Sequence, residues 1–191
     1  MSNESVPLSE AWHRPVGNYY EDFEEGRTFQ HHWGRTIGEG DNARFTTLRI
    51  NANPLHFNRE YATARGHDDV VVDPVLVFNT TLGLSVEDLS ERDTLFLGVE
   101  NCRFYKQLTV GSTIAAESEV LERRESSSRP GYGIVTWWTT AYDGTGDRVV
   151  EYERTNLVPK RGASGGSTGE VGRTDDPAVD DGADEPEGDA S

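Results

Sequence analysis

Three side chains that can do chemistry lie in one short bend, Asn51-Ala52-Asn53-Pro54-Leu55-His56. The imidazole of His56 changes protonation near neutral pH and can act as a general base or acid. The amides of Asn51 and Asn53 can orient a water molecule or a carbonyl group, but they cannot carry a proton at pH 7. Pro54 cannot continue a helix and pushes Asn53 towards extended geometry, so we expect a rigid turn. The bend therefore predicts an acid–base site centred on His56, with a purely structural histidine as the competing interpretation.

Other kinds of site have no signature in the chain. There is no phosphate-binding glycine loop, no nucleophile elbow and no metal-ligand spacing, so we expect no metal and no cofactor. The single cysteine, Cys102, excludes an internal disulfide and lies in a strand-like sequence, where we expect a packed small side chain and not a nucleophile. His31 and His32 are adjacent in a predicted strand and point to opposite faces. We therefore expect an ordinary half-exposed pair that cannot hold one metal.

Two short helices are predicted on either side of the bend. Asp41 can serve as the N-cap of a helix over residues 42–48. Asn58 can cap a second helix over residues 59–65, and Gly66 suits the left-handed conformation at its end. The bend should thus be held between two helices.

The most apolar segment of the chain, residues 70–86, predicts a central helix. Asp73 followed by Pro74 is a strong start signal, an N-cap carboxylate before a proline at the first helical position. The segment has little polar face, so we expect this helix to be buried on most sides. The backbone N–H groups at its start could polarise a carbonyl group, although Asp73 would occupy one of them as a cap.

Alternating patterns predict strands over residues 27–37, 95–105, 114–125, 134–142 and 148–158. One long helix and these strands predict an α+β fold, with a long central helix wrapped by an antiparallel sheet of about five strands. Such a sheet has an outer face and edges to cover. We therefore expect a homodimer or a higher even oligomer.

The charge of the chain restricts its partners and environment. The formal net charge is −16, with 34 acidic against 18 basic residues, and only Lys106 and Lys160 are lysines. Residues 162–191 carry half of that net charge, so the remainder of the chain is acidic too. This composition predicts a protein kept soluble in concentrated salt. It also argues against nucleic acid as a partner, because binding there depends on neutralising phosphates.

Composition also divides the chain into three parts. Residues 1–16 are polar and predict a flexible N-terminus, residues 17–161 predict one domain, and residues 162–191 predict a disordered acidic tail. No apolar run approaches the length of a membrane span, and the N-terminus lacks the apolar core of a signal peptide. We therefore expect a cytoplasmic protein without a membrane partner.

The bend and the residues after it, 53–62, resemble the hydratase motif of the MaoC-like, (R)-specific enoyl-CoA hydratases. Residues 22–26, 103–104 and 110–112 support the resemblance, which extends over about 19–161. It implies the hotdog fold, assembly as dimers or double-hotdog chains, and acyl-CoA thioesters as substrates.

A fuller match narrows the resemblance to the mesaconyl-CoA hydratase, or β-methylmalyl-CoA dehydratase, branch. It is carried by residues 42–46, 51–57, 82–86, 125–131 and 133–136. The resemblance implies that His56 deprotonates a water held by residue 51, that the hydroxide adds to the β-carbon, and that the same imidazolium protonates the α-carbon. The wider family has an aspartate at the position of Asn51, whereas this branch tends to carry asparagine.

The resemblance also implies substrate-binding residues. The wider family has a glycine whose N–H faces the thioester oxygen, and Pro74 aligns with it, so the donor must come from Val75 or elsewhere. We also expect Asn53 and Asp73 to contribute to substrate binding at the same site. Arg129, in the Ser-Arg-Pro-Gly loop, is a candidate for a coenzyme A phosphate or a substrate carboxylate, with a solvated loop arginine as the alternative.

Three other functions stay open on the sequence. A general (R)-specific enoyl-CoA hydratase would act on crotonyl-CoA, and an acyl-CoA thioesterase would use the same fold. A non-catalytic acyl-CoA-binding subunit would account for Asn51 in place of the aspartate.

Overall fold

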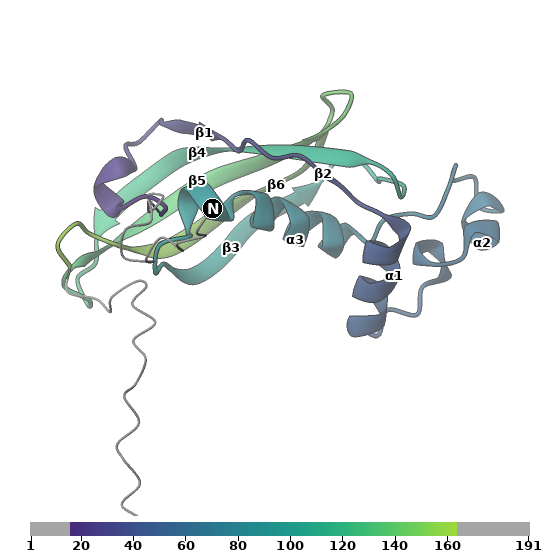
Figure 1. Ribbon diagram of the computed structural model, residues 1–191, viewed down its shortest axis with the longest axis horizontal. Coiled ribbons are helices and arrows are strands. Elements are labelled where there is room, and N and C mark those ends of the chain that lie inside the picture. The colour runs from purple at the N-terminus through teal and green to yellow at the C-terminus, as the bar shows by residue number, and fades with distance from the viewer. Residues whose placement is uncertain (1–15, 164–191) are drawn as a thin grey trace, which may run out of the picture.

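The computed structural model describes residues 16–163, which form one curved antiparallel sheet with a helix running along its inner face (Figure 1). The domain predicted over residues 17–161 lies within this described range. The predicted flexible segment 1–16 and the predicted acidic tail 162–191 lie outside the described residues, apart from their innermost residues. No helix within the described range has both the length and the apolar character required to cross a membrane.

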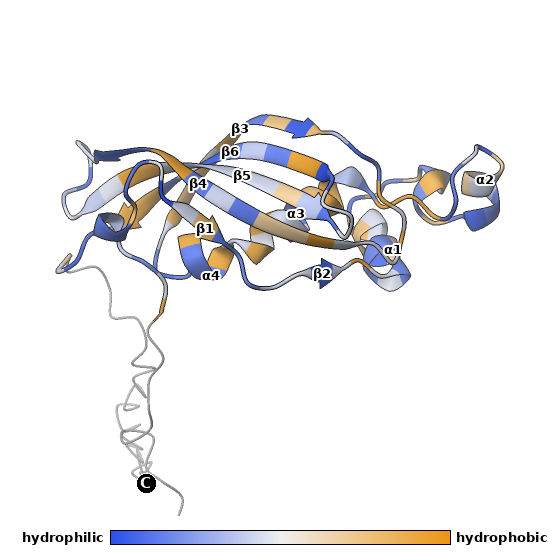
Figure 2. Ribbon diagram, turned by 90° about the horizontal axis from the view of Figure 1, so that it is seen from above, coloured by the Kyte–Doolittle hydropathy of each residue, from blue (hydrophilic) through white to orange (hydrophobic). Residues whose placement is uncertain are grey.

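The helices and strands follow one another as η2 (Tyr20–Asp22), β1 (Thr28–Gln30), β2 (Arg35–Thr36), α1 (Glu39–Leu48), η3 (Pro54–His56), α2 (Arg59–Thr63), α3 (Pro74–Leu84), α4 (Val86–Leu89), β3 (Leu95–Phe104), β4 (Thr113–Glu125), β5 (Tyr132–Asp143) and β6 (Arg148–Pro159). The strands lie in the order β1-β4-β5-β6-β3, and β2 also pairs with β4. Apolar and hydrophilic bands alternate along these strands, as expected where one face of a sheet packs on a core (Figure 2).

The predicted first strand over residues 27–37 is wrong, because it is broken into β1 and β2. Gln30 pairs with Glu117 of β4, and Arg35 pairs with Ile114. From Gln30 to Arg35 the chain advances five residues, whereas its partner β4 advances only three. The two extra residues cannot pair with β4. The break lies where the chain turns the side chain of His31 into the core.

His31 itself corrects the expectation of a half-exposed pair. Its side chain is buried, with Nδ1 2.7 Å from Oδ2 of Asp88 and Nε2 2.9 Å from Oγ of Ser118. Ser118 is in turn 2.8 Å from the hydroxyl of Thr139. His32 points to the other face and is half exposed. The buried ring thus lies in a chain of hydrogen bonds that the alternating pattern does not reveal.

The start of α3 confirms the prediction from the Asp-Pro pair. Oδ1 of Asp73 accepts a hydrogen bond from the N–H of Val75 at 2.8 Å, and Pro74 is the first helical residue. The expected burial on most sides is wrong: Val77 and Thr81 are buried, but the other apolar residues of the helix are only partly covered. A single sheet covers one side of the helix and leaves the opposite side open.

Helices α1 and α2 lie beyond one end of the sheet (Figure 1). Helix α1 begins three residues earlier than predicted, with Gly38 as its N-cap, because the carboxylate of Asp41 accepts the N–H of Gly38 at 3.0 Å from inside the first turn. The prediction for α2 is confirmed at its start, where Asn58 accepts the N–H of Tyr61. Gly66, just past its end, has a φ of 88°.

Cys102 is exposed, contrary to the expected packed position. It lies on the edge strand β3 beside Asn101, which has a φ of 52°, and the pairing with β6 shifts between Glu100 and Arg103. Cys102 therefore lies in a bulge, where its side chain is open to solvent. Partial desolvation raises the pKa of the thiol, which does not favour a nucleophile.

Candidate active site

The bend forms a 3-10 turn, η3, that holds His56 in a buried position. Asn53 caps the turn with its side chain, which accepts the N–H of Leu55 at 3.2 Å. Nδ1 of His56 is 2.9 Å from the backbone oxygen of Val71. Because a carbonyl oxygen only accepts, Nδ1 must carry the hydrogen, and the neutral ring then presents an unprotonated Nε2. Within residues 16–163, Nε2 has no hydrogen-bond partner. His56 is therefore set up as a base.

Asn42, a buried residue of α1, ties the elements of the site together. Its Nδ2 donates to the backbone oxygens of His56 at 2.8 Å and Val71 at 3.1 Å. Its Oδ1 accepts the N–H of Asp73 at 2.9 Å. One amide thus fixes the histidine turn and the start of α3 relative to α1. It is a partner of the His56 oxygen and the Asp73 N–H, and it shares the Val71 oxygen with Nδ1 of His56.

Asp73 is the centre of a second group of side chains. Its carboxylate is fully buried, and Nη1 of Arg49 lies 2.6 Å from Oδ1 and 2.7 Å from Oδ2. Nδ2 of Asn51 donates to Oδ2 at 2.8 Å, and the N–H of Val75 donates to Oδ1. All these partners are donors, so the buried carboxylate is compensated by one cation, one amide and the start of a helix.

These contacts also fix the orientation of the Asn51 amide. Nδ2 faces the carboxylate of Asp73, and Oδ1 accepts the N–H of Asn53 at 3.1 Å. If the amide were reversed, its oxygen would face Oδ2 of Asp73, and its NH2 group would face the N–H of Asn53. Neither pair could form a hydrogen bond. Asn51 keeps one lone pair on Oδ1 and one N–H on Nδ2 with which it can hold a water molecule.

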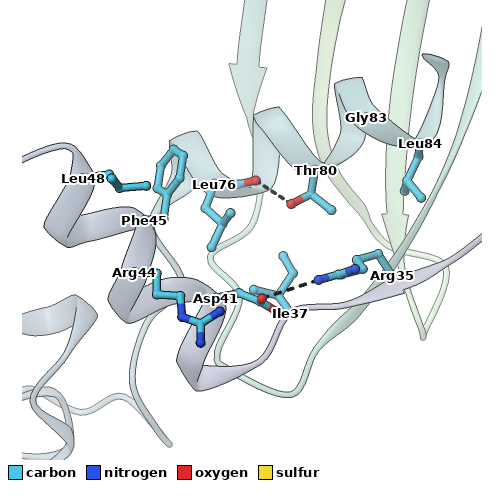
Figure 3. Close-up of a pocket in the computed structure, with 10 residues that line it drawn as sticks. All are labelled: Arg35, Ile37, Asp41, Arg44, Phe45, Leu48, Leu76, Thr80, Gly83 and Leu84. Atoms are coloured by element: carbon cyan, nitrogen blue, oxygen red, sulfur yellow. Dashed lines mark hydrogen bonds and ion pairs between the residues drawn. The ribbon is translucent and has the colours of Figure 1, made fainter. Parts of the chain in front are cut away.

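Two cavities lie beside α1, and one of them reaches the site. One, of about 340 Å³, reaches Asn51 and continues between α1 and the side chain of Phe57. The other, of about 440 Å³, lies between α1 and α3. Figure 3 shows Phe45 and Leu48 of α1 facing Leu76 of α3 across this second cavity.

The rim of the second cavity is charged. Arg35 forms a long ion pair with Asp41, at 3.4 Å, and Arg44 on α1 has no ion pair within the described part of the chain (Figure 3). The cavity is otherwise lined by apolar side chains and Thr80. It can receive a ligand with an apolar body and an anionic group.

The site residues predicted from the sequence divide into two groups. Asn51, Asn53, His56, Asp73 and Val75 come together through the contacts described above. Arg129 does not join them: it follows β4, and the connection between β4 and β5 lies at the end of the sheet away from α1 and α2 (Figure 1). Its guanidinium stacks 4.2 Å from the ring centre of Tyr132.

The model of a family described as mesaconyl-CoA hydratase matches residues 5–190. The chain belongs to this family. The mesaconyl-CoA hydratase of Haloarcula hispanica is 35% identical over 177 residues, which are 91% of this chain and 49% of that protein. The chain spans about half the length of the curated relatives that it matches.

Solved structures confirm the hotdog fold. A MaoC domain protein from Chloroflexus aurantiacus, described as a putative dehydratase, superposes with a TM-score of 0.72 at 30% identity. The match covers 80% of this chain and 43% of that one. A Mycobacterium tuberculosis protein described as a double hotdog fold gives a TM-score of 0.69 at 24% identity, over 85% of this chain and 52% of that one.

The sequence did not identify Arg49 and Asn42 as residues of the site. Asn42 lies in one of the segments that carry the resemblance, but nothing in a single sequence distinguishes a buried amide in a helix from an exposed one. Arg49 follows the last residue of α1 and has no motif of its own. Its role arises from a contact across 24 positions, to Asp73, which local patterns do not encode.

Proposed function

We propose that this chain is a hydro-lyase that adds water reversibly to the double bond of an enoyl-CoA thioester, with mesaconyl-CoA converted to β-methylmalyl-CoA. The observation that carries the proposal is the hydrogen bond from Nδ1 of His56 to the oxygen of Val71, which leaves Nε2 as a base in the bend whose first amide, Asn51, is fixed by Asp73. The family match and the names of the relatives supply the substrate class.

The proposed reaction uses one water molecule and one proton carrier. Nε2 of His56 accepts a proton from a water whose other hydrogen is held by Oδ1 of Asn51. The hydroxide forms a bond to the β-carbon, and the electrons of the double bond move to the α-carbon and the thioester oxygen as an enolate. The imidazolium then returns its proton to the α-carbon, so that the elements of water have been added and His56 is neutral again.

The thioester is proposed to lie along α1 and α3, with its apolar part in the cavity lined by Phe45 and Leu76. Val75 remains the proposed donor to the thioester oxygen. Its N–H would then leave Oδ1 of Asp73, which retains Arg49 as a partner. Arg129 remains a proposed ligand of a coenzyme A phosphate, and its substitution by alanine is expected to raise KM with little change in kcat.

The test is the loss of absorbance of the conjugated thioester when mesaconyl-CoA is added in high salt. His56→Ala is expected to lower kcat by about 100- to 10,000-fold, the usual contribution of general acid–base catalysis. His32→Ala, which alters a half-exposed histidine in the segment between β1 and β2, is the matched control. Full activity in His56→Ala would refute the mechanism.

Two alternatives are separated by the same assay. A higher kcat/KM for crotonyl-CoA than for mesaconyl-CoA would identify a general (R)-specific enoyl-CoA hydratase. Binding of the thioester without any loss of absorbance would identify a non-catalytic acyl-CoA-binding subunit, which the amide of Asn51 in place of a carboxylate favours.

The proposal extends to assembly and environment. The open side of α3 and the exposed apolar residues of edge strand β3, among them Leu95, Phe96 and Leu97, support a homodimer or a higher even oligomer. The acid-rich, lysine-poor composition supports an enzyme that works in concentrated salt, and we propose that it is cytoplasmic.

A further inference from the structure

We propose that Arg49 binds the second carboxylate of a dicarboxylic substrate and thereby selects mesaconyl-CoA over thioesters that lack this group. The inference rests on the proposed function and specifies its substrate class. In mesaconyl-CoA the free carboxylate is attached to the β-carbon, the atom that receives the water. A residue that recognises it must therefore lie beside the water-binding groups and not at a distance from them.

Arg49 meets this requirement of position. Its Nη1 and Nδ2 of Asn51 donate to the same carboxylate, that of Asp73. The backbone N–H of Asp73 is bonded to Asn42, which also holds His56. The guanidinium is thus adjacent to the amide that is proposed to hold the water.

The ion pair with Asp73 is open on one side. The side chain of Arg49 is 39% exposed, whereas that of Asp73 is 1% exposed. Both contacts pass through Nη1, and among residues 16–163 neither Nε nor Nη2 has a hydrogen-bond partner. The remaining edge of the guanidinium has the parallel N–H groups that bind a carboxylate through two hydrogen bonds.

The orientation of that free edge is fixed before a ligand arrives. The guanidinium carbon lies 5.4 Å from the centre of the Phe45 ring, and the backbone N–H of Arg49 is bonded to the oxygen of Phe45 at 3.1 Å. Phe45 also lines the cavity between α1 and α3. The arginine is therefore held between Asp73, which contacts Asn51, and a side chain that lines that cavity.

Asp73 does not cancel the positive charge of Arg49 towards a ligand. The carboxylate also accepts hydrogen bonds from Asn51 and from Val75 at the start of the eleven-residue helix α3. These neutral donors and the helix dipole share the compensation of its charge. Some of the attraction of Arg49 for an anion is thus left for the substrate.

A purely structural Arg49, which only neutralises Asp73, is the alternative. Arg49→Lys separates the two roles, because lysine keeps a cation for Asp73 but cannot present two parallel N–H groups. Tigloyl-CoA is the matched ligand, since it has a methyl group where mesaconyl-CoA has the carboxylate. Arg124→Lys, at an exposed arginine of β4 that pairs with Glu122, controls for the loss of a guanidinium elsewhere.

The decisive experiment measures dissociation constants of mesaconyl-CoA and tigloyl-CoA by calorimetry, with His56→Ala in every protein to prevent turnover. Arg49→Lys is expected to weaken mesaconyl-CoA binding by about 10- to 100-fold, the range of a hydrogen bond between charged groups, and to change tigloyl-CoA binding less than about threefold. Arg124→Lys should change neither.

Equal effects on both thioesters, or no effect on either, would overturn the assignment of Arg49. The readout is binding, so it is independent of whether the native chain catalyses hydration. Failure of the proposed function would appear separately, as an absence of turnover of mesaconyl-CoA by the protein with His56 intact.

Discussion

Asn51→Asp is the substitution that examines the site most directly, because it introduces the residue that the wider MaoC-like family has at this position. In the structure, Nδ2 of Asn51 donates to Oδ2 of Asp73 at 2.8 Å. The substitution would replace this donor with a second carboxylate oxygen. The introduced carboxylate would then face the buried carboxylate of Asp73, so two negative charges would repel each other. The hydrogen bond from the amide to Asp73 would also be lost.

The expected loss of stability follows from this distance. With charge centres about 4 Å apart and an effective dielectric constant of about 20, the repulsion is about 4 kcal/mol. Attraction between the new carboxylate and Arg49 offsets part of it, so we expect a net loss of about 2–3 kcal/mol at neutral pH. Activity on mesaconyl-CoA should fall as well, because the water-holding group and Asp73 would repel each other.

The loss should depend on pH in a defined direction. Repulsion raises the pKa of the introduced carboxyl in the folded state above its value in the unfolded chain. The folded state then binds more protons between these two values, so the free energy of unfolding decreases as pH rises through this window. Unfolding in denaturant between about pH 4 and pH 8, at one fixed salt concentration, should show the variant approaching the native protein only at the acidic end.

A double variant that exchanges the residues at positions 51 and 73 tests whether the two side chains are coupled. Combining Asn51→Asp with Asp73→Asn restores one carboxylate and one amide, and it leaves Arg49 with an anionic partner. We expect the pair to recover most of the lost stability, with a coupling energy of about 1–3 kcal/mol. If Asn51→Asp alone is as stable as the native protein at neutral pH, with a flat pH dependence, the reasoning from the Asn51–Asp73 contact is wrong.

Three further results are expected. Asn42→Ala removes three hydrogen bonds to buried backbone groups and should lower the free energy of unfolding by about 2–4 kcal/mol, whereas Asn79→Ala on the exposed side of α3 should cost under about 1 kcal/mol. Burial lowers the pKa of His31 although Asp88 opposes the shift, so the free energy of unfolding should fall as pH drops below about 6.5. His31→Gln should remove this pH dependence. A variant with the pH dependence of the native protein would contradict the role of His31. Phe96→Glu on β3 should shift the assembly to monomers in sedimentation, and an unchanged mass would exclude this edge as the interface.

The sequence predicted best those features whose cause is local. Asp73 and Pro74 start α3 because a cap and a proline act on their own first turn. Asn58 starts α2 for the same reason. Asn53 and Pro54 likewise make the turn that holds His56. The fold class followed from adding these elements to an alternating pattern of strands, which needs no knowledge of long-range contacts.

Features that depend on distant partners could not be predicted. His31 is buried with hydrogen bonds to Asp88 and Ser118, which are 57 and 87 positions away in the sequence. The alternating strand pattern alone predicted a half-exposed side chain. The break between β1 and β2 is set by the register against β4. The open side of α3 was missed because a continuous apolar run does not tell whether protein from the same chain or from another copy covers it.

The contacts of Asn51 in the structure give this residue a different role from the one that the sequence pattern suggests. Compared with the family pattern, an asparagine there removes an acid–base group. In the structure a carboxylate is present nonetheless, on Asp73, and it contacts the amide that took its position. That carboxylate also holds Arg49, which an aspartate at position 51 would have drawn into a competing ion pair. With an amide at position 51, Asp73 keeps Arg49 as its partner, and the rest of the guanidinium stays available for the carboxylate that we propose the substrate brings to the β-carbon.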